Sequence, residues 1–97
     1  MIKHVVCFRL KDNSEQKKNE ARDVLMSMKG KVDLIRDIFV GVDFLGSDRS
    51  FDIILEVMLD NKKALEDYQN DKYHCEVVKT YMHAHRTDSV AIDCEIQ

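Results

Sequence analysis

Four segments of the chain alternate apolar side chains with side chains of other kinds, and this alternation constrains the fold more than any other feature. A period of two residues places successive side chains on opposite faces of a β-strand. The pattern predicts strands over residues 2–11, 35–46, 51–60 and 88–96. One face of each is nearly all apolar, and we expect these faces to lie beneath helices. The residues concerned are Ile2, His4, Val6, Phe8 and Leu10, then Ile38, Val40, Val42 and Phe44, then Phe51, Ile53, Leu55, Val57 and Leu59, and finally Val90, Ile92, Cys94 and Ile96.

Two other regions follow the helical period of 3.6 residues. The first begins after an N-cap at Asn13 or Ser14, and Gly30 is its predicted stop. Its apolar stripe consists of Ala21, Val24, Leu25, Met28 and Val32. The second begins after a cap at Asp60 or Asn61 and breaks near residues 70–72. Its first piece carries Ala64, Leu65 and Tyr68 on one side, and its second piece carries the stripe His74, Val77, Val78 and Tyr81.

The order β-α-β-β-α-β predicts an α+β, ferredoxin-like fold, a four-stranded antiparallel sheet with helices on one face. The chain has no proline and three glycines, so we expect residues 1–97 to form a single domain. Two helical regions cannot cover both faces of the sheet. The other face carries Val5, Phe39, Ile54 and Met58, which favours a homodimer that pairs sheet against sheet. The alternative is a monomer whose outer sheet face is solvated.

Composition excludes several classes of protein. A net charge of −3, with lysines interleaved among acids, gives no reason to expect a nucleic-acid partner. No segment approaches the roughly 18 apolar residues of a membrane-spanning helix, so we expect no membrane partner and a cytoplasmic location. The three cysteines, Cys7, Cys75 and Cys94, contain no CxxC pair, which favours reduced thiols.

Three polar rings fall on faces predicted to be buried. His4 is the polar member of its strand face, Tyr68 lies on the buried side of the short helix, and His74 leads the last stripe. A neutral imidazole can accept a proton from a carbon acid. A phenol can donate a hydrogen bond to a carbonyl oxygen that becomes an enolate. These roles predict an acid–base pair in a pocket. The simpler alternative is structural: Tyr68 hydrogen-bonds His74 and ties the helix break, and His4 bonds a backbone carbonyl or water.

Metal and haem binding are weaker hypotheses. His83 and His85 could join Cys75 or Cys94 around zinc, but their spacing matches no standard site. A haem would need one helical histidine as its axial ligand, with His74 the best placed, and nothing else in the chain supports it. The sequence therefore predicts no metal and no cofactor.

The chain resembles the stress-responsive A/B barrel (Dabb) family, a branch of the dimeric α/β-barrel superfamily. The resemblance is carried by "IKHVVCFRLK", "IRDIFVGVDF", "SFDIILEVMLDNKKALEDYQNDKYHCEVV" and "VAIDCE". Its most specific element is Y-x5-H, Tyr68 to His74. Members commonly have a proline just before the histidine region and a closing D-Y-E; here Lys72 and "DCE" stand in those places.

The resemblance implies a homodimeric barrel with a small pocket between sheet and helices in each subunit. One member is a plant polyketide cyclase, olivetolic acid cyclase, in which residues matching Tyr68 and His74 carry an aldol condensation. A histidine that matches His4 lines that pocket. We therefore expect Tyr68 and His74 to be catalytic, and the pocket to bind a small carbonyl or phenolic metabolite. The predicted substrate-binding residues are His4, Val6, Phe8, Val24, Leu25, Met28 and Val77. The alternative is a non-catalytic, stress-associated dimer, because the fold hosts many functions.

Overall fold

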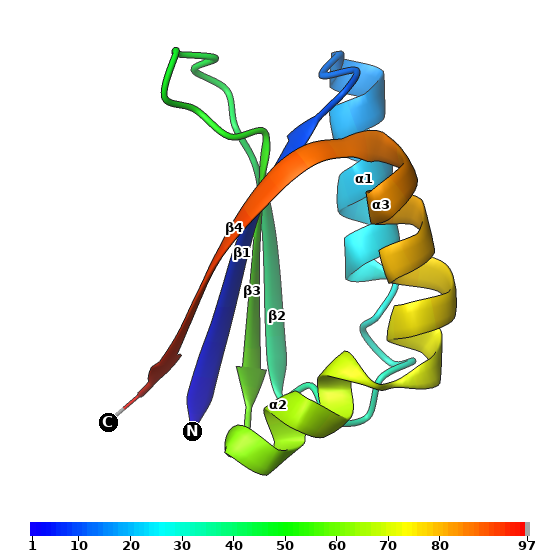
Figure 1. Cartoon of the computed structure of the whole chain (residues 1–97), viewed down its shortest axis with the longest axis vertical. Coiled ribbons are helices and arrows are strands. Elements are labelled where there is room, and N and C mark those ends of the chain that lie inside the picture. Colours follow the sequence, from blue (N-terminus) through cyan, green and yellow to red (C-terminus); the bar gives the residue numbers. More distant parts are fainter. Residues whose placement is uncertain (97) are drawn as a thin grey trace.

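The computed structural model describes residues 1–96, and Gln97, the last residue of the predicted domain, lies outside the described part. The elements are β1 (Ile2–Leu10), α1 (Glu15–Met26), β2 (Asp37–Val42), β3 (Ile53–Leu59), α2 (Lys62–Gln69), the π-helix η1 (His74–Lys79), α3 (Thr80–His85) and β4 (Arg86–Glu95). The strands form one antiparallel sheet in the order β2-β3-β1-β4. The helices lie on one side of it (Figure 1). The predicted ferredoxin-like fold is confirmed.

The hydrophobic core lies between the sheet and the helices. β1 and β3 pair so that His4 faces Val57 and Val6 faces Leu55, and opposed residues of an antiparallel pair share a face. The apolar faces predicted for these two strands therefore meet on the helix side. β2 joins them through Ile38 and Val40. The buried apolar residues are Ile2, Phe8, Leu10, Ala21, Leu25, Met28, Val32, Ile53, Leu55, Val57, Leu59, Ala64, Tyr68, Val78 and Met82.

α1 and α2 each begin directly after an N-cap residue that the sequence predicted. The Ser14 hydroxyl accepts a hydrogen bond from the Lys17 N–H at 3.3 Å, and the Asn61 side chain accepts one from the Ala64 N–H at 2.8 Å. These N-caps satisfy backbone donors that have no partner within the helix. α1 ends at Met26, and Gly30, with φ of +83°, lies in the turn that follows.

The last helical region differs from the predicted α-helical stripe. It opens as the π-helix η1, in which N–H groups bond five residues back, so each turn takes up more residues than an α turn. His74, Val78 and Met82 are therefore buried beneath it, whereas Val77 is 42% exposed. The prediction that Val77 shares the buried stripe of His74 is wrong for this reason.

The apolar face of β4 is also reversed relative to its prediction. β4 pairs with β1 so that Ile92 faces Val5 and Val90 faces Cys7, on the side away from the helices. Val90 and Ile92 are 54% and 68% exposed, and Cys94 is exposed as well. The β1 register decides the face, because one strand's alternation does not say which of its sides meets the core. Phe44, predicted for the covered face of β2, lies beyond the strand and is 95% exposed.

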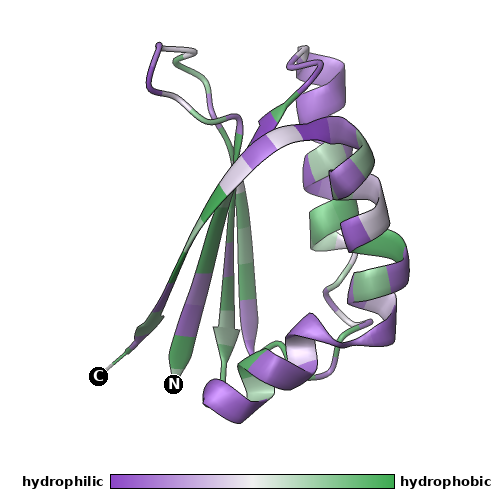
Figure 2. Cartoon of the chain, viewed as in Figure 1, coloured by the Kyte–Doolittle hydropathy of each residue, from purple (hydrophilic) through white to green (hydrophobic). Residues whose placement is uncertain are grey.

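The outer face of the sheet is consequently more apolar than predicted. Phe39, Val90 and Ile92 are exposed on it, and Val5, Cys7, Ile54 and Met58 beside them are half-buried. An ion pair joins Lys3 to Glu56 at 3.0 Å on this face. Figure 2 shows apolar residues in bands along the strands. The helices in that view lie on the other side of the sheet and leave this outer face uncovered. No helix formed by residues 1–96 has the length and apolar character needed to cross a membrane.

Candidate functional site

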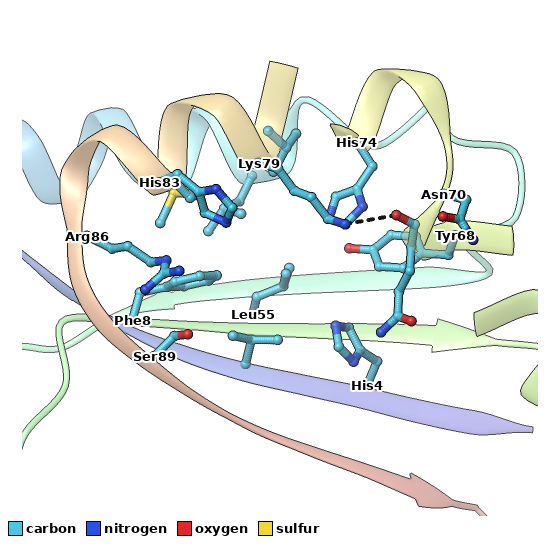
Figure 3. A pocket seen from close by; sticks show the side chains of 15 residues that line it. His4, Phe8, Leu55, Tyr68, Asn70, His74, Lys79, His83, Arg86 and Ser89 are labelled. Carbon is cyan, nitrogen blue, oxygen red and sulfur yellow. Dashed lines mark hydrogen bonds between the residues drawn. The ribbon is translucent and has the colours of Figure 1, made fainter. Parts of the chain in front are cut away.

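A cavity of about 400 Å³ lies between the sheet and the helical layer. β1 and β3 form its floor, η1 and α3 its roof, and β4 closes one side (Figure 3). Its lining residues are His4, Val6, Phe8, Leu25, Leu55, Tyr68, Gln69, Asn70, His74, Val78, Lys79, Met82, His83, Arg86 and Ser89. The volume falls in the lower part of the range of roughly 300–1,000 Å³ found for small-molecule sites.

The three polar rings predicted for the buried layer stand together at one end of this cavity. Tyr68 from α2 stacks on His74 from η1, with ring centroids 4.4 Å apart and an interplanar angle of 24°. His4 from β1 meets the edge of Tyr68, with centroids 5.6 Å apart. All three side chains are buried. Residues separated by up to 70 positions in the sequence therefore share one wall, because the antiparallel sheet brings β1 beneath the α2–η1 corner.

Tyr68 is held as a neutral hydrogen-bond donor. Its hydroxyl donates to the Met28 sulfur at 3.6 Å, and its side chain is completely buried. Burial, followed by the negative charge of Asp71, raises the pKa of Tyr68 well above its ordinary value. Tyr68 does not hydrogen-bond His74, as the structural alternative required; the two rings stack instead. A thioether is a weak acceptor, so a stronger oxygen acceptor could displace it.

His74 is held in its neutral form. The Asp71 carboxylate accepts a hydrogen bond from the His74 backbone N–H at 3.0 Å, which fixes the start of η1. Burial, followed by the charge of Lys79, lowers the pKa of His74 from 6.5 to about 4. Its Nδ1 is buried and has no hydrogen-bond partner within the described part of the protein. An unsatisfied buried polar atom costs about 1–3 kcal/mol, and such atoms are often found at functional sites.

Asp93 is a site residue that the sequence did not reveal. Its carboxylate hydrogen-bonds Nδ1 of His4, and the two residues sit opposite each other in the β1–β4 register. A histidine that donates from Nδ1 to a carboxylate presents Nε2 as an acceptor. The predicted orientation of β4 put Cys94 on the covered face and therefore its neighbour Asp93 on the outer one. The family's closing D-Y-E element, present here as "DCE", was the available signal.

Three basic side chains also line the cavity and were not predicted to. Lys79 lies in η1, His83 in α3 and Arg86 at the start of β4. Lys79 Nζ donates to the Gln69 carbonyl oxygen at 2.9 Å. None of the cavity-lining residues is an aspartate or a glutamate. Helical spacing of four residues from Lys79 was the available signal for His83, whereas Arg86 lies in β4, where helical spacing does not apply.

The remaining predicted binding residues divide into two groups. Val6, Phe8 and Leu25 line the cavity. Met28 is buried in the core and reaches the site only through Tyr68. Val24 packs against the edge of the core, and Val77 points outward because of the π-helical turn.

The cysteines and the His83–His85 pair form no recognisable metal centre. Cys7, Cys75 and Cys94 are free thiols. Within residues 1–96, no three His, Cys, Asp or Glu side chains gather as metal ligands would. His85 instead stacks on Tyr81, with ring centroids 4.2 Å apart, and Tyr81 donates to the Glu20 carboxylate at 2.6 Å. These residues tie α3 to α1.

Comparisons with known proteins agree with this architecture. The family model of the stress-responsive A/B barrel domain matches residues 2–96. No curated protein matches the chain by sequence.

Solved structures share the fold at low sequence identity. A dimeric ferredoxin-like protein of unknown function from Bacteroides fragilis is 21% identical, with a TM-score of 0.81, over 98% of this chain and 95% of its own. A protein from Arabidopsis thaliana is 20% identical, with a TM-score of 0.84, over 100% and 96%. A hydroxynitrile lyase from Passiflora edulis is 19% identical, with a TM-score of 0.80, over 99% and 93%. At these identities the likeness establishes the fold alone.

Proposed function

Because the chain belongs to the stress-responsive A/B barrel domain family, we propose that it is a homodimer whose cavities bind a small carbonyl or phenolic metabolite and transform it by acid–base chemistry without a cofactor. One observation carries this proposal. His74, stacked on Tyr68, lines a cavity of about 400 Å³, and burial keeps its imidazole neutral. We assign the proton acceptor to Nε2, because Nδ1 is enclosed by protein atoms and has no hydrogen-bond partner among residues 1–96.

In the proposed reaction His74 is the base and Tyr68 polarises the substrate. The carbon next to the carbonyl gives its proton to the imidazole, and the electron pair of the broken C–H bond moves to the carbonyl oxygen. Tyr68 leaves the Met28 sulfur and donates its hydrogen bond to that oxygen, which becomes an enolate. The imidazolium and the enolate then form an ion pair, which offsets the low pKa of His74. The enolate then either takes the proton back from the imidazolium at another atom or attacks a second carbonyl carbon. In the second case the oxygen of that carbonyl becomes an alkoxide and takes the proton from the imidazolium, which returns His74 to its neutral form.

His4 and Asp93 serve the same end of the cavity. The hydrogen bond from Nδ1 of His4 to Asp93 fixes the ring and presents Nε2 to the ligand. In this role His4 binds a hydroxyl or phenol of the substrate, and Asp93 is a positioning residue that acts through His4. We place Val6, Phe8 and Leu25 around the apolar part of the ligand.

We also propose that the dimer forms through the outer sheet face. Phe39 on β2 and Val90 and Ile92 on β4 are exposed there, with the half-buried Val5, Cys7 and Ile54 on the two strands between them. Burying such a face against a second copy is the usual solution for a sheet covered on one side only. The B. fragilis protein of the same fold is described as dimeric. The non-catalytic alternative, a dimer with a fully packed layer, leaves no reason for the cavity.

Hydrogen–deuterium exchange tests the chemistry. The substrate is 4-methoxyacetophenone, a neutral aryl methyl ketone, in D₂O, and NMR follows the loss of its methyl protons. We expect the protein to accelerate exchange, and His74→Gln and Tyr68→Phe each to lower the catalysed rate about 10²-fold or more. Tyr81→Phe is the matched control and should retain the rate, because the hydroxyl that it removes bonds Glu20 outside the cavity. Equal exchange by wild type and His74→Gln contradicts the proposal.

A further inference from the structure

We propose that Arg86, assisted by His83, forms a carboxylate-binding subsite, so that the ligand is an apolar keto acid with its carbonyl at Tyr68–His74 and its carboxylate at Arg86. The position of the carbonyl rests on the function proposed above, whereas the carboxylate subsite rests on the cationic residues themselves. Figure 3 shows the two ends of the cavity: Tyr68, His74 and His4 lie at one, and Arg86, His83 and Ser89 at the other.

The charges of these residues are not balanced within the protein. Lys79, His83 and Arg86 form no ion pair in the part of the chain that the structure describes, and no acidic residue lines the cavity. Three other arginines each pair with an aspartate; they are Arg9 with Asp88, Arg22 with Asp23 and Arg36 with Asp60. A chain with a net charge of −3 thus keeps its cavity free of acids.

Arg86 is moreover partly withdrawn from water. It is half-buried, at the point where α3 ends and β4 begins. The register between β1 and β4 shifts at Arg9/Leu10, and Arg86 pairs with Leu10, whose side chain lies in the core. The start of β4 curves from the end of α3 toward the sheet (Figure 1), and this irregularity turns Arg86 toward the cavity that it lines. A half-buried guanidinium without a counter-charge is costly, and a bound anion removes that cost.

The cavity between the two polar ends is apolar. Val6, Leu55, Val78 and Met82 lie along it, with Phe8 near Arg86. An aromatic ring or short alkyl chain of the ligand fits this middle section. The polar groups of the ligand must then lie at its opposite ends. The ligand class that satisfies both ends is therefore a small acid with a carbonyl remote from the carboxylate.

A carboxylate suits the subsite better than a phosphate. The guanidinium fork matches the two oxygens of a carboxylate. The subsite lies at the C-terminal end of α3, which ends at His85. Helix C-termini carry partial negative charge and disfavour a second negative charge on the ligand. One permanent cation and one imidazole are sufficient for a monoanion.

Calorimetric titration with two isosteric probes tests the inference. The probes are 4-acetylbenzoate and its neutral amide, 4-acetylbenzamide, which differ only at the end expected to meet Arg86. We expect wild type to bind the acid at least tenfold more tightly than the amide. The variant Arg86→Gln should lose that preference while it still binds the amide. Arg22→Gln, at an exposed arginine on α1 remote from the cavity, is the matched control and should keep the preference.

Three results overturn the inference. One is equal affinity of wild type for acid and amide, and another is failure to bind either probe. The third is a preference for the acid that survives in Arg86→Gln. Inorganic phosphate that displaces 4-acetylbenzoate at equal concentration overturns the assignment to a carboxylate. Exchange of the neutral ketone 4-methoxyacetophenone is measured separately, so the acid–base function and the carboxylate subsite stand or fail independently. Thermal melting of each variant excludes loss of folding.

Discussion

Nδ1 of His4 hydrogen-bonds the carboxylate of Asp93 across 89 positions of sequence, because β1 and β4 are neighbours in the sheet. His4 is buried and Asp93 is not, so the carboxylate reaches in from the open edge of the site. The bond fixes both the ring orientation and the tautomer of His4. The proposed site thus contains two histidines in different settings. His4 is oriented by a carboxylate, and His74 has an Nδ1 without a partner among residues 1–96.

Replacing Asp93 should weaken the function without unfolding the protein. In Asp93→Asn the amide NH₂ can face Nδ1 and force the other tautomer, so Nε2 no longer accepts. We expect the exchange rate with 4-methoxyacetophenone to fall about tenfold or more, and the pH profile of the rate to shift. Asp88→Asn, which breaks an exposed ion pair with Arg9 at 3.7 Å, is the control. A pH profile that is identical in wild type and Asp93→Asn would remove Asp93 from the positioning role.

Acid should destabilise the protein through His74. Its pKa is about 4 in the folded chain, against an ordinary value of 6.5. As pH falls, His74 is protonated in the unfolded chain before it is protonated in the folded chain. The free energy of unfolding is therefore at its full value above about pH 6.5 and decreases as pH falls towards 4. The loss is of the order of 2 kcal/mol, with allowance for solvent screening in the open cavity. Urea unfolding at pH 7 and pH 4.5 measures it.

His74→Gln isolates this effect, since the other titrating groups remain. The free energy of unfolding of the variant should fall less between pH 7 and pH 4.5 than that of wild type. An equal fall in both proteins would mean that His74 does not carry the acid sensitivity.

A charge on the outer sheet face should break the dimer. Ile92 is 68% exposed in the single chain, and we expect Ile92→Asp to be a folded monomer, because a buried unpaired carboxylate opposes association. Light scattering after size-exclusion chromatography should give twice the chain mass of 11.3 kDa for wild type and one chain mass for the variant. Val77→Asp places the same charge on the helical layer, at a residue 42% exposed, and should remain dimeric. Identical masses for both variants contradict the proposed interface.

The π-helical turn makes neighbouring valines unequal. Val78 is buried and Val77 is half exposed, whereas a regular α-helix starting at His74 would place both on one stripe. Val78→Ala should lower the free energy of unfolding by about 1–2.5 kcal/mol, and Val77→Ala by less than about 0.5 kcal/mol. Chemical denaturation of the two variants side by side checks this. Equal losses would mean that the turn is α-helical.

Local signals predicted much of the architecture. Alternation predicted β1, β2 and β3, and helical periodicity predicted α1 and α2. The caps at Ser14 and Asn61 marked where those two helices begin. Where several local preferences point the same way, an element's type follows from its own residues. For the same reason the sequence places Tyr68 and His74 on buried faces without any knowledge of contacts between them.

Contacts between elements decided the rest. The side of β4 that meets the core depends on its register with β1, and that register placed Val90 and Ile92 outside and Asp93 beside His4. The widened turn of η1 moved Val77 outward and left His74 and Val78 inside. The shift at Leu10–Arg86 brought Arg86 to the cavity. The order of secondary structure and the burial of Tyr68 and His74 were therefore determined by the sequence alone, because they depend on neighbouring residues. The partner of His4, the basic lining and the outer apolar face were decided only by the tertiary structure, because strand register and helical phase arise when distant segments pack together.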